Sequence, residues 1–438
     1  AANNLAGIVV TANAATAGQG VWQYSADGST GWTTIGTGLT SASGLFLPAG
    51  YTLRFVPNAN WNGTPGNLTA RLVDDSTGSL PAAGASVDVS NDTTLSGGTT
   101  RYSNSANAVT LSTSVGAVND APTLSAASIN LDEDIGSAAN TGSTVSALFG
   151  SLYGDGTDNV SGGSSAQAFA GLAVSGNSAD PATQGRWQYN TGAGWVDVPT
   201  NLSTGNALIL PTSASLRFAP VADYNGTPPV LAVHAIDASA GSVAAAQSGQ
   251  DLGTVGGGSR YSTATTLTAV VAAVNDAPTI AGFAGTPVFV ENAATPVRLD
   301  LDGNVVVADV ELGGNWNGAT LTVQRSGTAN SADIFGFVDD SPGNPALGVQ
   351  TSGSAIVVDG VAVGGFTQVG GKLTITFNAS ADAASVGRVV GALSYRNTSD
   401  VPPAFAQINV VLSDQNTGGA QGSGGVLTAQ SSVTVNIV

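Results

Sequence analysis

The chain has 438 residues, of which 29 are acidic and 11 are lysine or arginine, and the formal net charge is −18. So few basic residues exclude nucleic acids and anionic membrane surfaces as partners, because both are bound through basic patches. The chain has no cysteine, which excludes disulfide bonds and thiolate metal sites, and no run approaches the ~20 apolar residues of a membrane-inserting helix.

The first two thirds of the chain contain one sequence pattern twice. Both copies end in the same seven residues, AVNDAPT, at 117–123 and 273–279. The first copy lacks the counterpart of about 121–164, so we expect this chain to begin within a module and to be cut from a longer precursor. The matching segments are GVWQYSADGSTGW (20–32) and GRWQYNTGAGW (185–195), LRFVP (53–57) and LRFAP (216–220), NWNGTP (60–65) and DYNGTP (223–228), LTARLVDDS (68–76) and LAVHAIDAS (231–239), and GGTTRYS (97–103) and GGGSRYS (256–262).

Short strands account for nearly the whole pattern. Segments such as TLTVQR (320–325), KLTITFN (372–378) and SVTVNIV (432–438) alternate apolar and polar residues, and glycine, asparagine and aspartate clusters separate them. The exception is SADAASVGRVVGALS (380–394), where Val386, Val389, Val390 and Leu393 share a helical face and predict a short helix.

This pattern predicts an all-β chain of tandem Ig-like β-sandwich modules arranged end to end. We expect a truncated sandwich over 1–118, a complete one of the same type over 119–274, and a related but different one over 275–438.

The repeated junction contains side chains suited to a hard cation. Pro122 and Pro278 fix the backbone and stiffen the start of the next strand. The residues just before them include two asparagine–aspartate pairs, Asn119 with Asp120 and Asn275 with Asp276. Calcium takes six to eight oxygen ligands, so loops of the flanking modules must supply the remaining ones.

Such loops occur in both complete modules. Acidic residues lie on the first strand of the second module, in its loop YGDGTDN, and after each penultimate strand. Sandwich loops at one end would bring them to the junction, which predicts a calcium site; the alternative for each is an Asx turn or a cap. The candidates are Glu133, Asp155, Asp158 and Asp237 in the second module, and Asp309, Glu311 and Asp414 in the third.

The junction and the series WQY, LRFxP and DYNGTP resemble the cadherin-like, VCBS-type tandem repeats of large bacterial surface adhesins. The resemblance covers essentially the whole chain. It implies a cadherin-like extender on the bacterial cell surface, exported by type I secretion and associated with biofilms, whose partners are calcium, neighbouring modules or subunits, and surface glycans or proteins.

Carried over residue by residue, the resemblance assigns calcium ligands to two interfaces. Two departures matter. The first module has no acidic first strand, which leaves its site short of ligands, and the glycine-rich nonapeptide repeats of the secretion signal are absent from this sequence. The implied ligands are Asn119, Asp120, Asp155, Asp158 and Asp237 at the first interface, and Glu133, Asn275, Asp276, Asp309, Glu311 and Asp414 at the second.

Two other functions stay open at this point. A self-assembling filament, sheath or surface-layer subunit would use the open strand edges of an incomplete first module. A carbohydrate-binding module would use the repeated aromatic residues as a platform, although cross-strand packing explains them as well. These residues are Trp22, Tyr24 and Trp32, with their copies Trp187, Tyr189 and Trp195.

No enzyme is expected. The one histidine, His234, lies in an alternating strand without a patterned nucleophile or acid. We expect Arg54 and Arg217, in the repeated LRF, to hold a loop carboxylate or carbonyl. The long segment 76–103 and its copy 239–262 either contact a partner or cover a sheet edge.

Overall fold

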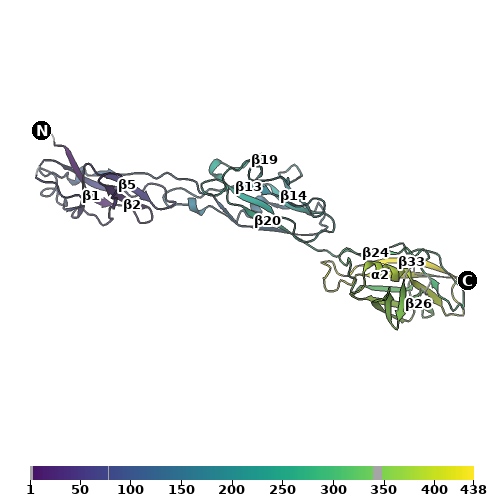
Figure 1. The fold of residues 1–438 in the computed structure, drawn as a ribbon. Helices are drawn as coiled ribbons and strands as arrows, with labels where there is room; N and C mark the ends of the chain where they lie inside the picture. Colours follow the sequence, from purple (N-terminus) through teal and green to yellow (C-terminus); the bar gives the residue numbers. More distant parts are fainter. Residues whose placement is uncertain (1–2, 77, 339–347) are drawn as a thin grey trace.

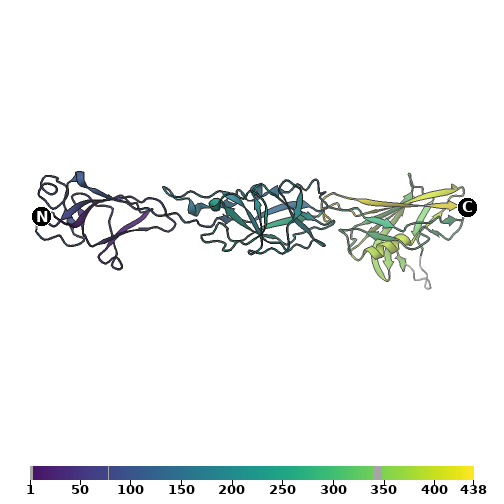
Figure 2. The same cartoon turned by 90° about the horizontal axis from the view of Figure 1, so that it is seen from above.

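The computed structural model describes residues 3–76, 78–338 and 348–438. The chain forms three β-sandwiches in a row, with the two termini at opposite ends of the molecule (Figures 1 and 2). This confirms the all-β fold class with tandem β-sandwiches arranged end to end. Within the described ranges, no helix has the length and apolarity needed to cross a membrane.

The first sandwich pairs a five-stranded sheet, in the order β7-β4-β1-β6-β8, with a three-stranded sheet, β3-β2-β5. Val10, Trp22 and Leu68 are among the buried residues between them. Its elements are β1 (Leu5–Asn13), β2 (Gly20–Ser25), β3 (Thr33–Thr34), β4 (Gly44–Pro48), β5 (Thr52–Pro57), β6 (Leu68–Asp74), β7 (Ser86–Val87) and β8 (Val109–Leu111), with a 3₁₀ turn at Ser105–Asn107.

The second sandwich repeats this plan and adds to it. Its larger sheet has the order β10-β20-β18-β13-β16-β19 and its smaller sheet the order β11-β17-β14-β15. Its elements are β10 (Ala127–Asp132), β11 (Ser143–Thr144), α1 (Val145–Phe149), β13 (Phe169–Gly176), β14 (Gly185–Asn190), β15 (Trp195–Asp197), β16 (Ala207–Pro211), β17 (Ser215–Pro220), β18 (Leu231–Asp237), β19 (Gln247–Gln250) and β20 (Thr265–Ala272), with 3₁₀ turns at Gly156–Asp158 and Ala238–Ala240.

The third sandwich has the most extensive core. An eight-stranded sheet, β22-β33-β32-β25-β30-β29-β28-β27, faces the sheet β23-β31-β26. Its elements are β22 (Val288–Phe289), β23 (Val297–Arg298), β25 (Thr320–Arg325), β26 (Asp333–Phe337), β27 (Val349–Ser352), β28 (Ala355–Val358), β29 (Val361–Val369), β30 (Lys372–Phe377), α2 (Ala383–Gly391), β31 (Leu393–Asn397), β32 (Phe405–Ser413) and β33 (Thr428–Ile437).

Two further strand pairs lie just after the junctions. β9 (Thr123–Leu124) pairs with β12 (Tyr153–Gly154), and β21 (Thr279–Ala281) pairs with β24 (Val306–Ala308). Each pair ties the strand that follows a junction proline to the strand that precedes an acidic loop. The register Thr123–Gly154 and Thr279–Ala308 is equivalent in the two cases.

The helix predicted within 380–394 is confirmed as α2. Asp382 caps it in a reciprocal capping box with Ser385, and Val386, Val389 and Val390 are buried. The helix ends at Gly391, so Leu393 begins β31 instead.

Helix α1 was missed from the sequence. Thr144 caps it, and Val145 and Phe149 are fully buried. A five-residue helix shows no periodicity long enough to recognise.

The segment 76–103 and its copy both cover the larger sheet of their sandwich. β7 extends the sheet beside β4, and β19 extends it beside β16. Val89 packs with Val9, Phe46 and Val73 on the outer face, and Leu252 lies in the corresponding cluster of the second sandwich. The part of these segments that the structure describes therefore covers a sheet edge, which is one of the two roles that the sequence left open.

Candidate metal centres at the two junctions

At the first junction, the linker pair is held by the loops of the second sandwich. The Asn119 side-chain amide donates to Asp237 Oδ2 at 3.1 Å and to the carbonyl oxygen of Ser259 at 3.1 Å. The backbone N–H of Asp120 donates to both carboxylate oxygens of Asp158, each at 3.2 Å. The structure therefore brings together Asn119, Asp120, Asp158 and Asp237, four of the residues predicted from the sequence.

The fifth residue, Asp155, directly follows β12 and begins the 3₁₀ turn that carries Asp158. Asp155 and Asp158 are 6% and 4% exposed. Burial raises the pKa of both carboxyl groups, and the negative charges of Asp120 and Asp237 raise it further. Among the described residues, no lysine or arginine forms an ion pair with either carboxyl group, so the pocket holds acids that repel one another.

The second junction has the same arrangement. The Asn275 side-chain amide donates to Asp414 Oδ2 at 2.7 Å and to the carbonyl oxygen of Gly425 at 3.0 Å. The backbone N–H of Asp276 donates to Glu311 Oε2 at 2.9 Å. Asp309 directly follows β24, as Asp155 follows β12. The third sandwich thus builds the same acidic loop from a different sequence.

The second sandwich contributes the other side of the second junction. Glu133 is 1% exposed; its Oε1 accepts from the backbone N–H of Val274 at 2.7 Å, and its Oε2 from the Asn225 amide at 2.9 Å. Carboxylate oxygens of Asp134, Asp223 and Asp276 lie within 4.8 Å of one another, which makes them a candidate metal-binding group among the described residues. Glu133 therefore supports the site through the linker backbone.

Asp223 was missed in the sequence analysis, and Asp134 was not assigned to a site. Both have left-handed backbones, with φ of 61° and 57°. The signal for Asp223 lay in the repeat, because DYNGTP places it where NWNGTP has Asn60, also at φ 61°. Asparagine and aspartate tolerate this conformation best among residues with a side chain.

Several buried oxygen atoms at the junctions have no hydrogen-bond partner among the described residues. An unpaired buried polar atom is costly, and native proteins rarely leave one unexplained. Six of the unpaired atoms are carboxylate or amide oxygens beside further carboxylates, which is the donor set of a hard cation such as calcium. They are Asn119 Oδ1 and Asp155 Oδ1 at the first junction, and Asn275 Oδ1, Asp276 Oδ2, Asp309 Oδ2 and Glu311 Oε1 at the second.

Burial also raises the pKa of the acids at the second junction. For Asp276 the charges of Asp134, Asp223 and Glu133 add to this effect. The charges of Asp414 and Asp276 raise the pKa of Asp309 further, and those of Asp276 and Asp309 raise the pKa of Glu311 further. In the absence of a cation, folding therefore favours the protonated form of the carboxyl groups at both junctions over the ionised form.

We therefore expect opposite pH responses with and without calcium. After calcium removal on a chelating resin, acidification from pH 7 toward pH 5 should raise the melting temperature. The reason is that these carboxyl groups have a higher pKa in the folded state than in the unfolded state. They therefore stabilise the fold at low pH, and this stabilisation is lost as the pH rises through the folded-state pKa. With saturating calcium, acidification should lower the melting temperature, because protons compete with calcium for the carboxylates. Calorimetry at the two pH values tests this, and a melting temperature that falls on acidification of the calcium-free protein would contradict it.

Exposed acids do not interfere in this window. Asp27 is an example, since hydrogen bonds from Thr30, Ser29 and Ser25 hold its pKa well below its usual range. The stability that it contributes is lost only as the pH falls below ~4.

The repeated aromatic residues do not form an open platform. Trp22 and Trp187 are 4% and 0% exposed, and each packs edge-on against the phenylalanine opposite it, Phe55 or Phe218. Cross-strand packing is therefore confirmed. The guanidinium groups of Arg54 and Arg217 lie 3.9 and 4.0 Å from the ring centroids of Trp32 and Trp195 and cover one face of each. One face of each of these half-buried rings is therefore unavailable for stacking on a sugar.

The prediction for the two arginines is confirmed for one of them. Arg217 donates to the loop carbonyl oxygens of Ser137 and Asn140, at 3.1 and 2.6 Å. Arg54 donates instead to Gln23 Oε1, so the prediction of a loop carboxylate or carbonyl is wrong for it.

His234 is fully buried in the second sandwich. Its Nδ1 lies 2.7 Å from the carbonyl oxygen of Ser262, which can only accept, so Nδ1 carries the proton. Nε2 lies 2.9 Å from the Ser175 hydroxyl oxygen. This contact ties two neighbouring strands together.

Comparisons with known proteins find similarity of three-dimensional structure but no similarity of sequence. No protein-family model matches the chain, and no curated protein matches its sequence. Among solved structures, the chain is similar to the protocadherin gammaB4 extracellular domain at 12% identity and a TM-score of 0.31, covering 98% of this chain and 48% of that one. It is also similar to Drosophila N-cadherin EC1-4, at 10% identity and a TM-score of 0.17 with 98% and 71% covered.

A third similar structure is AggA, the major subunit of aggregative adherence fimbriae type I from Escherichia coli. The identity is 13% and the TM-score 0.18, with 38% of this chain and 99% of AggA covered. The chain thus spans about half the length of the protocadherin domain and nearly the whole length of AggA.

Proposed function

We propose that this chain is an extender region of a large bacterial cell-surface or extracellular matrix adhesin, made rigid by calcium at its two junctions. The proposed modules are 1–118, 119–274 and 275–438, with junctions at the two NDAP sequences. Its role is mechanical: the sandwiches in series hold an adhesive part of the parent protein at a distance.

One observation carries this proposal. Two loops of unlike sequence, around Asp155 and around Asp309, meet the same linker pair in the same way, and both leave buried oxygens unpaired. Ordinary turn or capping aspartates would have their oxygens satisfied within their own loops, as Asp27 does with Ser29 and Thr30. A cation that bridges the linker and the loop explains the orphaned oxygens.

Calcium bound there would supply positive charge and oxygen coordination. It would offset the repulsion among the buried carboxylates and make the ionised form the stable one. Because the linker and the flanking loops would share one ion, the angle between successive sandwiches would be fixed. Since the ion binds the folded junction and not the unfolded chain, it would also stabilise the sandwiches that contribute ligands.

The two junctions are expected to differ in affinity. On the N-terminal side, the second junction has Glu133, Asp134 and Asp223, whereas the equivalent position of the first has the neutral residues Asn60 and Asn62. The Asn62 amide donates to the Ser164 hydroxyl at 2.8 Å, and Asn62 Oδ1 accepts from the backbone N–H of Ser164 at 2.6 Å. The equivalent residue at the second junction, Asn225, donates instead to the carboxylate of Glu133. Calcium affinity follows the number of charged ligands, so the second junction should fill at lower calcium.

Matched variants at each junction test the proposal. Asp158→Asn should abolish calcium uptake at the first junction and leave the second intact, and Glu311→Gln should do the reverse. Isothermal titration should show two classes of site in the natural chain and one in each variant. Asp27→Asn, in a hairpin of the first sandwich, is the control and should retain both classes of calcium site. Calcium isotherms that are unchanged in both junction variants would refute the proposal.

A self-assembling subunit is the second candidate. The strand edge beyond β8, which no described strand covers, supports it. This candidate predicts assemblies that grow with protein concentration in light scattering, whereas the extender predicts a monomer at every concentration.

A further inference from the structure

The first and second sandwiches share a plan, but one flank is covered in only one of them. In the second sandwich, residues 119–149 run along this flank as linker, strand β10 and helix α1. The first sandwich has the same surface. Among the described residues no strand or helix covers it, and the side-chain amide of Asn3 donates to Asp74 Oδ2 at 3.4 Å. We call this surface the open flank; it consists of a linker seat, the strand edge 111–116, an apolar groove and Arg54, each described below.

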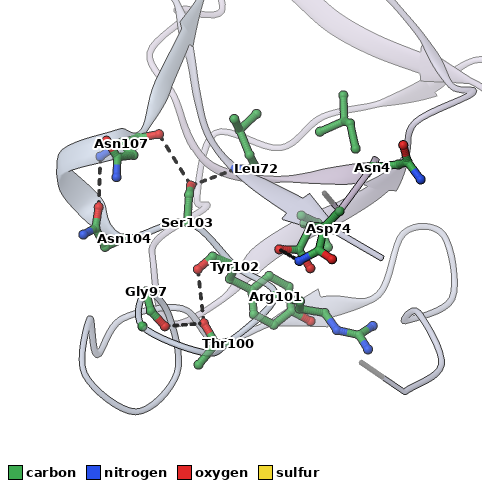
Figure 3. A pocket seen from close by; sticks show the side chains of 14 residues that line it. Asn4, Leu72, Asp74, Gly97, Thr100, Arg101, Tyr102, Ser103, Asn104 and Asn107 are labelled. Atoms are coloured by element: carbon green, nitrogen blue, oxygen red, sulfur yellow. Dashed lines mark hydrogen bonds between the residues drawn. The ribbon is translucent and has the colours of Figure 1, made fainter. Parts of the chain in front are cut away.

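The linker seat is the pocket in Figure 3, lined by Asp74, Gly98, Thr100 and Arg101 among others. In the second sandwich, the equivalent residues Asp237, Gly257 and Ser259 hold Asn119 and the backbone N–H of Ala121. Asp74 also repeats the local geometry of Asp237. Its Oδ1 accepts from the backbone N–H of Ser76 at 2.9 Å, as Asp237 Oδ1 does from Ser239 at 2.8 Å.

The strand edge comes next. In the second sandwich, β10 pairs in parallel with residues 267–272 over six positions. In the part of the chain that the structure describes, no strand pairs with the equivalent residues 111–116 of the first sandwich on that side, and β8 ends the sheet order. Leu267 is fully buried under this pairing, whereas its counterpart Leu111 is only half-buried.

An apolar groove of about 350 Å³ lies between the two sheets of the first sandwich, lined by Ile8, Leu47, Leu53 and Leu111 among others. The equivalent residues Leu172, Leu210, Leu216 and Leu267 are fully buried in the second sandwich, where they share a core with Val145 and Phe149 of α1. Ile8 and Leu53 remain half-buried. The groove therefore corresponds to the binding place of α1.

One position on the groove differs. Tyr51 stands where the second sandwich has Ala214, whose carbonyl oxygen accepts from the backbone N–H of Val145. The Tyr51 ring lies 6.1 Å from the Tyr24 ring and still leaves the groove volume open. The backbone turn is the same at both positions, since the N–H of Tyr51 donates to the Pro48 carbonyl oxygen as that of Ala214 donates to the Pro211 carbonyl oxygen.

Arg54 completes the comparison. Arg217 and Arg54 both stack on a tryptophan and both bond a glutamine, Gln188 or Gln23. Arg217 also donates to the carbonyl oxygens of Ser137 and Asn140, which precede β11 in the covering segment. No such loop lies beside Arg54 among the described residues.

We propose that the open flank is a docking surface for another polypeptide segment with the chemistry of residues 119–149. Such a segment has an Asn-Asp-Ala-Pro linker, an alternating strand, and a helical turn with valine and phenylalanine four residues apart. The linker would meet Asp74, the strand would pair with 111–116, and the two apolar side chains would fill the groove. This inference is independent of the cation proposal, because it rests on the repeated surface alone.

A peptide of residues 119–150, titrated into the full chain with chelator present, tests this directly. We expect saturable 1:1 binding by calorimetry and a higher melting temperature for the first sandwich alone. Phe149→Ala in the peptide should weaken binding at least about 100-fold, because the phenylalanine is its main buried group. Ser146→Ala, at an exposed position of α1, is the matched peptide control and should bind as the unmodified peptide does.

Two outcomes would overturn the docking proposal. One is the absence of binding, or binding that Phe149→Ala leaves unchanged. The other is dimerisation of the chain by itself, measured without peptide over a concentration series and abolished by Leu53→Asn, because the occupant would then be a second copy. Since chelator is present throughout, a negative result here leaves the calcium proposal standing.

Discussion

Removing calcium is expected to lower the melting temperature of the second and third sandwiches by about 5–10 °C. Extracellular calcium modules bind with a Kd of about 0.1–1 mM, so ~10 mM calcium at the tight end of that range adds about 2.7 kcal/mol for each ion. One kcal/mol shifts the melting temperature of a domain of this size by about 2–4 °C. Calorimetry in 10 mM calcium and then in excess chelator measures the difference.

The first sandwich provides an internal control for this experiment. It supplies Asn60 and Asn62 near the first junction but none of the predicted acidic ligands, so its own transition should move least. Magnesium at the same concentration should replace calcium poorly, because it demands strict octahedral geometry and keeps its water ligands. Equal melting temperatures in calcium and in chelator would show that the junction acids are ordinary turn residues.

The substitution Asp333→Asn is expected to destabilise the third sandwich by about 3–5 kcal/mol, with or without calcium. Asp333 is fully buried and accepts from Arg325 at 2.7 and 2.6 Å, from the Tyr395 hydroxyl at 2.8 Å and from Asn397 at 2.8 Å. Removing its charge leaves the Arg325 guanidinium with no compensating charge in a buried network. Denaturant unfolding of the full chain, followed at the third-sandwich transition, measures the loss.

The matched control is Asp359→Asn, in the same sandwich. Asp359 pairs with Arg388 at the surface, with its side chain 63% exposed, and exposed ion pairs contribute only ~0–1 kcal/mol. A loss for Asp333→Asn no larger than that for Asp359→Asn would contradict the importance of the network. Because neither residue lies at a junction, both variants should keep the full calcium response.

The sequence predicted the fold class and the linker side of both candidate sites because the repeat supplied the register. The shared ending AVNDAPT placed Asn119 and Asn275 in equivalent positions, and an aspartate after each penultimate strand placed Asp237 and Asp414 beside them. These contacts follow from strand order, which alternation and spacing reveal.

The other side of the second junction could not be derived in the same way. Asp134 and Asp223 meet Asp276 only because two turns with left-handed residues bring distant strands together, and such geometry has no periodic signal. Helix α1 was missed for a related reason, since five residues carry too little pattern. The different partners of Arg54 and Arg217 depend on a loop that only one of the two repeats contains.

Small-angle X-ray scattering of the full chain, in calcium and then in chelator, tests the central claim most directly. With calcium, the account predicts a monomeric rod whose scattering fits one conformation with the three sandwiches in line. With chelator, it predicts a broader distribution of dimensions from bending at the junctions, first at the one with fewer acids. Identical scattering in the two conditions would contradict a structural role for calcium at these junctions.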